Sequence, residues 1–175
     1  MKITELKLKD AYLIELEPHI DDRGTFARQF CKKKLNEHGL DFEICQCNLS
    51  ANKKEGTLRG LHYQKEPQLE KKLVSCFKGA FFDVIVDLRK DSPTYLQWDA
   101  IELTEKNHKM IYIPENFAHG FQTLEDDTVV YYQLSNYFAQ ELYSGLRWDD
   151  PKIGIKWPDC KNRIISERDN SYDLL

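Results

Sequence analysis

Short apolar segments rich in Val, Ile, Tyr and Phe, separated by turn residues, are the feature of this sequence that most restricts its fold. Runs of roughly four to eight such residues between Gly, Pro, Asp or Ser clusters are typical of β-strands. Turn signals occur at 21–24, 78–79, 90–93 and 125–127. The predicted strands are Tyr12–Leu16, Thr25–Gln29, Phe42–Asn48, Thr57–Gln64, Lys72–Phe77, Ala80–Leu88, Trp98–Leu103, Met110–Ile113, Ala118–Leu124 and Val129–Leu134.

Only one segment, Lys32–His38, has the pattern of a helix, and Gly39 follows it as a C-terminal stop. Short strands with almost no helices between them favour antiparallel sheets packed as a sandwich or barrel. The 175 residues contain no linker, repeat or low-complexity stretch. We therefore expect a single all-β domain over residues 1–175, with one short helix in the N-terminal third.

Composition excludes several classes of function. The net charge of -4 gives no basic field for nucleic acid, and no run approaches the roughly 20 apolar residues of a membrane span. The five cysteines are odd in number and form no CxxC pair, which argues against a zinc ribbon or a full disulfide framework. We expect a cytoplasmic protein that binds neither nucleic acid nor membrane.

Four polar and aromatic clusters are candidates for chemistry. They are Leu58–Gln64 with the lysines that follow at 71 and 72, Ile113–Phe121, the Tyr131–Tyr132 pair, and Ser166–Asp169. Each taken alone is weak evidence, because a strand histidine is more often a hydrogen-bonded structural residue than a base, and paired strand tyrosines usually pack. Alternation along a strand puts Gln46 and Asn48 on one face, and spacing alone favours the solvent face for them.

Metal binding is the competing interpretation of the histidines. His62 and His119 lie far apart in the sequence, and neither has a second histidine two residues away. The rest of the chain offers no good ligand spacing. We predict a site without metal.

The order of several motifs resembles the dTDP-4-dehydrorhamnose 3,5-epimerase family, from about Tyr12 to the end of the chain. The motifs are DDRGTF at 21–26, QCN at 46–48, GTLRGLHYQ at 56–64, KLV at 72–74, DVIVDLR at 83–89, SPT at 92–94, IP at 113–114, AHGF at 118–121, WDDP at 148–151 and IKWP at 155–158. The resemblance implies a cupin-type jelly roll, a homodimer, a nucleotide-sugar substrate and no cofactor.

The same resemblance implies a set of catalytic residues. The reaction removes a proton beside a ketone and returns one to the opposite face, so it needs a base, an acid and a group that stabilises the enolate. The family's base matches His62, oriented by a carboxylate that matches Asp169, and its proton donor matches Tyr132. Lys72 and Arg59 match cationic groups near the keto and phosphate oxygens.

Further matches concern the nucleotide. Arg23 and Arg168 match diphosphate-binding cations, while Phe26 matches an apolar wall. Gln46 and Asn48 match contacts to the base and sugar. His119 matches a substrate-contacting histidine, and the alternative for it is a core histidine that fixes the turn at 118–121.

Three positions depart from the resemblance, all at the nucleotide end. Arg28 and Tyr143 stand where glutamates are common, and Phe138 stands where a stacking tyrosine is common. Arg28 offers only hydrogen-bond donors, which suit adjacent acceptors on a base such as guanine. The primary expectation is a dTDP-linked 4-keto sugar epimerised at two centres. The alternatives are a GDP- or CDP-linked sugar, epimerisation at one centre, and a non-catalytic nucleotide-sugar-binding cupin.

Overall fold

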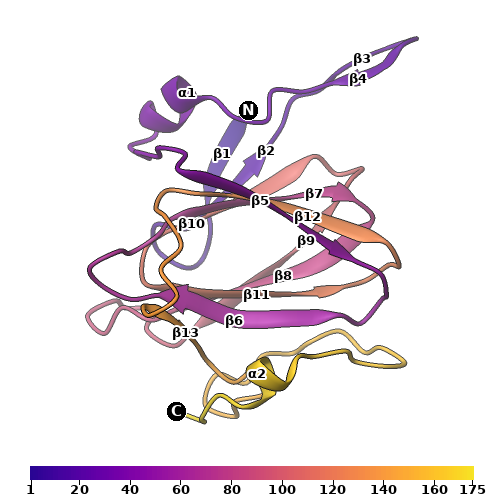
Figure 1. Cartoon of the computed structure of the whole chain (residues 1–175). Helices are drawn as coiled ribbons and strands as arrows, with labels where there is room; N and C mark the ends of the chain where they lie inside the picture. Colours follow the sequence, from indigo (N-terminus) through magenta and orange to yellow (C-terminus); the bar gives the residue numbers. More distant parts are fainter.

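Two antiparallel sheets stack face to face in the computed structural model, which describes all residues 1–175 (Figure 1). The six-stranded sheet contains, in spatial order, β1 (Lys2–Glu5), β2 (Tyr12–Glu15), β10 (Lys109–Ile113), β7 (Lys72–Lys78), β12 (Thr128–Leu134) and β5 (Gln46–Asn52). The five-stranded sheet contains β13 (Tyr143–Gly145), β6 (Leu58–Gln64), β11 (Phe117–Thr123), β8 (Ala80–Asp87) and β9 (Trp98–Thr104). Neighbours in space are seldom neighbours in sequence, as in a jelly roll, so the predicted all-β class is confirmed.

The main core fills the space between the two sheets. Phe81 and Ile85 of β8 pack there against Val74 of β7 and Val130 of β12, and all four side chains are fully buried. Strand β11 is buried at every position because it lies in the middle of its sheet. This packing holds the two inner faces in a fixed relation, and one end of the space between them stays open as a cavity.

The helices differ from the prediction. Helix α1 spans Lys32–Asn36, shorter than the predicted Lys32–His38, and buries Leu35 against Phe42. A second helix, α2 (Glu167–Asn170), was not predicted, so the expectation of one helix is wrong. Four residues carry too little periodicity to be recognised, although Ser166 accepts a hydrogen bond from the Asp169 N–H as its N-cap. Neither helix is long and apolar enough to cross a membrane.

Some observed strand boundaries also differ from the predicted ones. Strands β1, β3 and β13 were not predicted, and the predicted strand Thr25–Gln29 is observed as a shorter strand at Gly24–Phe26. The predicted strand at 42–48 is observed as β5 from Gln46, since Phe42 is drawn into a second core cluster beneath α1. Strands β3 (His19–Asp21) and β4 (Gly24–Phe26) form a separate two-stranded hairpin.

The β3–β4 hairpin extends away from the two sheets (Figure 1). All its residues are exposed, and Ile20 and Phe26 are 74% and 73% exposed. The chain returns along the outer surface of the six-stranded sheet, where the Gln29 side-chain amide donates a hydrogen bond to Ser75 Oγ at 2.8 Å. Ile20 and Phe26 therefore find no apolar partner within their own chain.

Candidate active site

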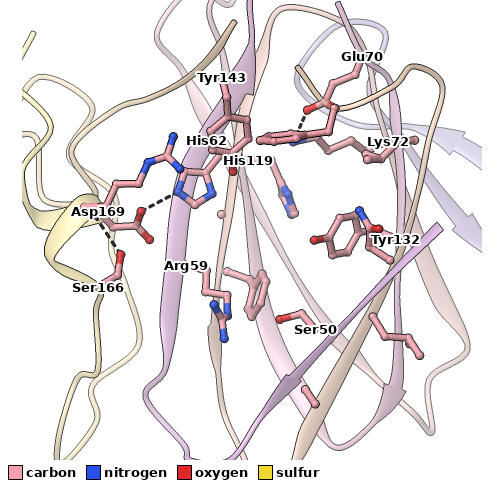
Figure 2. Close-up of a pocket in the computed structure, with 18 residues that line it drawn as sticks. Ser50, Arg59, His62, Glu70, Lys72, His119, Tyr132, Tyr143, Ser166 and Asp169 are labelled. Carbon is pink, nitrogen blue, oxygen red and sulfur yellow. Dashed lines mark hydrogen bonds and ion pairs between the residues drawn. The ribbon is translucent and has the colours of Figure 1, made fainter. Parts of the chain in front are cut away.

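A cavity of about 610 Å³ opens between the two sheets (Figure 2). One wall is formed by β5, β7 and β12 of the six-stranded sheet, and the other by β6 and β11 of the five-stranded sheet. Helix α2 and β13 close one side. The lining residues are Asn48, Leu49, Ser50, Ala51, Arg59, His62, Glu70, Lys72, His119, Gly120, Phe121, Tyr132, Leu134, Phe138, Tyr143, Ser166, Arg168 and Asp169. Such a volume is in the range of small-molecule sites.

His62 and Asp169 form a hydrogen-bonded pair on the β6 wall, with 2.7 Å between His62 Nε2 and Asp169 Oδ1 (Figure 2). Helix α2 carries Asp169 to the edge of β6, and the Gly60 N–H donates to Asp169 Oδ2 at 3.1 Å. Position 60 requires glycine, because its φ is +127° and a Cβ would lie 2.5 Å from Gly120 Cα. The bond through Nε2 leaves Nδ1 as the ring nitrogen of His62 without a protein partner.

Asp169 is held in its ionised form. Burial alone would raise the pKa of Asp169, but the hydrogen bonds from His62 and the Gly60 N–H outweigh it, and the pKa is lowered from its ordinary value. An ionised carboxylate fixes the orientation of the imidazole and stabilises the imidazolium when His62 takes up a proton. The pair therefore has the arrangement of a general base with its orienting group.

Tyr132 of β12 lies on the opposite wall (Figure 2). Its cross-strand partner is Asn48 of β5. Burial raises the pKa of Tyr132, while a hydrogen bond with Asn48 and the charge of Arg59 partly offset that effect. The phenol is consequently protonated at neutral pH. A protonated phenol facing a histidine–carboxylate pair across a cavity is a suitable proton donor.

Lys72 and Glu70 form a buried ion pair in the cavity, with 3.0 Å between Lys72 Nζ and Glu70 Oε1. Their side chains are only 9% and 6% exposed. Glu70 was not among the predicted site residues. Its spacing two residues before Lys72 was the available signal, since residues two apart share a face in extended chain. The pair places an ammonium group between the two walls and holds it there.

His119 has a carboxylate partner of its own. Its Nε2 lies 2.7 Å from Oδ1 of Asp83, a residue of β8 whose side chain is fully buried. His119 of β11 is also the cross-strand partner of His62 of β6. Asp83 was not predicted as a site residue, because it stands in an apolar run that reads as a core strand.

The mouth of the cavity is aromatic. Phe138 is 51% exposed and contacts Tyr143 edge to face, with ring centroids 5.2 Å apart. The Arg168 guanidinium lies 4.7 Å from the Tyr143 ring centroid. Gln46 does not line the cavity; its side-chain oxygen accepts a hydrogen bond from the Phe138 N–H. An exposed aromatic surface beside an arginine suits a base and a diphosphate.

Besides Gln46, three predicted nucleotide contacts do not line this cavity. Arg23 and Phe26 lie on the protruding β3–β4 hairpin, where Arg23 is paired with Asp21 at 2.6 Å. Arg28 lies beside the Cys31 thiol at the start of α1. The folded chain thus brings together every predicted residue from Asn48 onwards and leaves the N-terminal ones outside.

No group of three or more His, Cys, Asp or Glu side chains is arranged to hold a metal ion. The two histidines of the cavity are each bound to a separate carboxylate through Nε2. All five cysteines are free thiols. The polar groups of the cavity are therefore hydrogen-bonded pairs and cations rather than a ligand cluster.

Comparison with known proteins places the chain in a family. The family model of dTDP-4-dehydrorhamnose 3,5-epimerase matches residues 5–175. The dTDP-4-dehydrorhamnose 3,5-epimerase of Sinorhizobium fredii is 42% identical over 175 residues, which cover 100% of this chain and 90% of the relative. That of Methanothermobacter thermautotrophicus is 41% identical, with 99% and 94% covered.

Solved structures agree with this assignment. The Bacillus anthracis dTDP-4-dehydrorhamnose 3,5-epimerase, with TDP and PPi bound, superposes with a TM-score of 0.96 at 41% identity, and 99% of each chain is covered. The Legionella pneumophila dTDP-6-deoxy-D-glucose-3,5-epimerase, in complex with dTDP-4-keto-L-rhamnose, gives a TM-score of 0.94 at 34% identity, covering 99% of this chain and 92% of the other. The fold, the cavity and these likenesses together show that the chain belongs to the dTDP-4-dehydrorhamnose 3,5-epimerase family.

Proposed function

We propose that this protein epimerises a dTDP-linked 4-keto-6-deoxy sugar at the two carbons that flank the ketone. The observation that carries the proposal is the position of the His62–Asp169 pair and of Tyr132 on opposite walls of one cavity. Inversion requires a proton to leave from one face of the sugar ring and another to arrive on the opposite face. Two facing sheets supply the base and the acid from those two directions.

Proton removal is assigned to His62. Its Nδ1 takes the proton from the carbon next to the ketone, and the electron pair of that C–H bond moves to form an enolate. The carboxylate of Asp169 stabilises the imidazolium that results. One base on one face serves both flanking carbons in succession, since both lie next to the same ketone.

The enolate oxygen needs a cation or a hydrogen-bond donor. Lys72 supplies a compact ammonium with three donors, and its buried pairing with Glu70 fixes its position. Tyr132 then returns a proton from the other wall, and its raised pKa keeps that proton available. Arg59, whose Nε donates to Asn52 Oδ1 at 2.9 Å, is assigned to the phosphate side of the ligand.

The nucleotide is assigned to the aromatic mouth of the cavity. Phe138 offers a stacking face to the base, and Arg168 offers a cation to the diphosphate. Relatives crystallised with TDP and with a dTDP-linked sugar support dTDP as the nucleotide. A GDP- or CDP-linked sugar stays the alternative, because Arg28 replaces a commonly acidic residue.

We infer a homodimer in which the β3–β4 hairpin of each chain reaches the cavity of the other. The hairpin carries Arg23 and Phe26 away from their own cavity and leaves Phe26 73% exposed. An apolar patch of Leu49, Phe77 and Tyr131 lies on the outer face of the six-stranded sheet, where Phe77 and Tyr131 stack with centroids 4.4 Å apart. A second copy on this patch would cover exposed apolar surface that a monomer leaves in water.

The free cysteines and the cavity cations bear on where the protein works and on whether it uses a cofactor. We infer a cytoplasmic protein, because five free cysteines suit a reducing compartment. We also propose catalysis without a metal or organic cofactor, since the enolate is assigned to Lys72 and neighbouring donors.

The test is solvent deuterium incorporation with a panel of dTDP-, GDP- and CDP-linked 4-keto-6-deoxy sugars. We expect a mass increase of two deuterons on the dTDP-linked sugar, with inversion at both centres and no loss of rate after exhaustive chelation. One deuteron would indicate a single-centre epimerase. Exchange with none of the sugars, but tight nucleotide-sugar binding, would indicate a non-catalytic binding protein. Loss of activity on chelation, restored by a divalent metal, would contradict catalysis without metal.

A further inference from the structure

The two histidine–carboxylate pairs of the cavity have different surroundings. Both pairs join Nε2 to a carboxylate oxygen over 2.7 Å, and both histidines lie on the inner face of the five-stranded sheet as cross-strand partners. They differ in what else reaches the carboxylate. That difference decides how many protons each pair holds.

Asp169 is well supplied with donors. The Gly60 N–H reaches its second oxygen at 3.1 Å, while His62 binds the first. Asp83 has a single donor. Its Oδ1 is bound to His119, while its Oδ2 is buried without any hydrogen-bond partner.

The neighbours of Asp83 on the two adjacent strands are apolar. Its cross-strand partners are Phe121 on β11 and Ile101 on β9, and it lies in the interior of the domain with no exposed surface. Lys72 of β7 is the other charged group near enough to act on it, and it does so through space without a hydrogen bond. An ionised carboxylate in such a place is costly, so the pair favours keeping a proton.

We propose that Asp83 is a positioning residue that keeps a proton on its pair with His119, so that Nδ1 of His119 presents an N–H donor to the enolate oxygen. This inference rests on the proposed epimerase function. Nδ1 has no protein partner and is not among the buried unpaired atoms, so it is accessible from the cavity. Whether the shared proton is on Oδ1 or on Nε2, Nδ1 carries a hydrogen.

The consequence is a division of labour between adjacent strands. The His62 pair, with an ionised carboxylate that accepts hydrogen bonds at both oxygens, offers a lone pair at Nδ1 and acts as the base. The His119 pair, with a carboxyl whose pKa is raised by burial and only partly lowered by His119 and Lys72, offers a donor at the same ring position. In other enzymes, two groups of the same type acquire different pKa values from their surroundings, and one then acts as the base while the other acts as a donor.

The kinetic test uses Asp83→Asn. An amide at position 83 has no ionisable proton to share with His119. With its oxygen in the place of Oδ1 it accepts from Nε2–H, so Nδ1 of His119 becomes an acceptor. We expect kcat to fall by about 10²–10³-fold, the usual loss of one donor to an oxyanion, with the Kd for dTDP unchanged. In a His119→Asn background, whose amide N–H takes the place of Nδ1–H, the Asp83→Asn change should have almost no further effect on kcat. An equal loss in both backgrounds would overturn the proposal, because Asp83 would then not act through His119.

A second measurement observes the wild-type protein directly and needs no substrate. In protein labelled with ¹⁵N-histidine, the Nδ1 resonance of His119 should be that of a protonated nitrogen at neutral pH, and that of His62 should be unprotonated. Assignment uses His119→Asn and His62→Ala. A bare Nδ1 on His119 would overturn the proposal even if the Asp83 variant fails to fold. If instead the wild-type protein shows no deuterium exchange while Nδ1 of His119 is protonated, the proposed function has failed and the proton placement stands.

Discussion

His62 and His119 sit opposite each other on β6 and β11, and each binds a carboxylate through Nε2 at 2.7 Å. Their carboxylates come from different parts of the chain, Asp169 from helix α2 and Asp83 from strand β8. The two imidazoles therefore present the same ring atom, Nδ1, to one cavity with opposite expected roles.

Replacement of His62 by Ala should abolish deuterium exchange at both centres. We expect a rate loss of about 10²–10⁴-fold, because a positioned general base contributes roughly that factor. The measurement is deuterium incorporation by mass spectrometry, with the exposed His38→Ala as the matched control. Near wild-type exchange in His62→Ala would remove His62 from the role of base.

Replacement of Tyr132 by Phe should separate deprotonation from inversion. The base remains, so deuterium should still enter the substrate, but with retention of configuration, since delivery from the opposite wall is lost. Stereochemistry is read by NMR of the recovered sugar. Tyr131→Phe is the matched control, because the neighbouring tyrosine points to the outer face of the sheet. A normal yield of inverted product in Tyr132→Phe would assign the donor to another group.

Asp169→Asn should lower both activity and stability at neutral pH. The pKa of Asp169 is below its ordinary value of 3.8, so its ionised form stabilises the folded state above that pH, and this contribution is lost as pH falls through the folded pKa. We expect the free energy of unfolding at pH 7 to fall by about 1–3 kcal/mol, as for a charged hydrogen-bonded group.

The difference between wild type and Asp169→Asn should begin to shrink below about pH 4, where the unfolded carboxylate takes up a proton, and should disappear as pH falls through the lower pKa of the folded protein. Urea unfolding at several pH values measures it, and the exposed Asp173→Asn is the control. We also expect kcat to fall by about a hundredfold or more, from misorientation of the imidazole. A pH–rate profile identical to wild type would argue against the orienting role.

Mixing two inactive variants should restore activity if the hairpin of one chain completes the cavity of the other. A chain with Arg23→Ala and Phe26→Ala retains the His62 machinery, while His62→Ala retains the hairpin. Mixed dimers contain one complete site, so co-refolding should recover about a quarter of wild-type activity. The control mixture, His62→Ala with Tyr132→Phe, should remain without epimerase activity. No recovery in the first mixture, with dimers present, would place the hairpin outside the site.

Arg28→Glu tests base recognition. A good bidentate contact to a base is worth roughly 1–3 kcal/mol. If Arg28 made such a contact, its loss would weaken binding of the preferred nucleotide diphosphate about tenfold or more. Calorimetry with dTDP, GDP and CDP measures the preference, and Lys32→Glu is the charge-matched control. Because Arg28 lies beside Cys31 outside its own cavity, we expect a preference for dTDP that the substitution does not change. A preference for GDP or CDP that Arg28→Glu erases would assign the base contact to Arg28.

The sequence predicted the parts of the fold that have local signals. Long strands such as β8 and β11 have buried, apolar runs with turns at both ends, and both were predicted within one residue of their ends. The three-residue strand β13 and the four-residue helix α2 carry no comparable signal. They form because the sheet and the cavity edge hold them, which is a tertiary effect.

Site residues with a local sequence signal were predicted, and those that depend on tertiary structure were not. Residues within family motifs, such as His62 and Tyr132, were named from the sequence. Glu70 and Asp83 were missed, because a carboxylate is ordinary in a sequence until its burial beside a cation or a histidine is visible. The separation of Arg23 and Phe26 from the cavity was equally invisible, because a match to a motif does not say where in the folded chain its residues lie.

The pairing of His62 with Asp169 also bears on how the enzyme matures. The two residues are 107 positions apart, so His62 acquires its carboxylate partner only after most of the intervening chain has been arranged. Closing so long a loop costs more conformational entropy than forming local contacts, which slows the step. In addition, β6 must be in place before the Gly60 N–H can donate to Asp169 of α2. In a refolding experiment we therefore expect the sheets to regain their spectroscopic signal first, with catalytic competence appearing afterwards as a separate kinetic event.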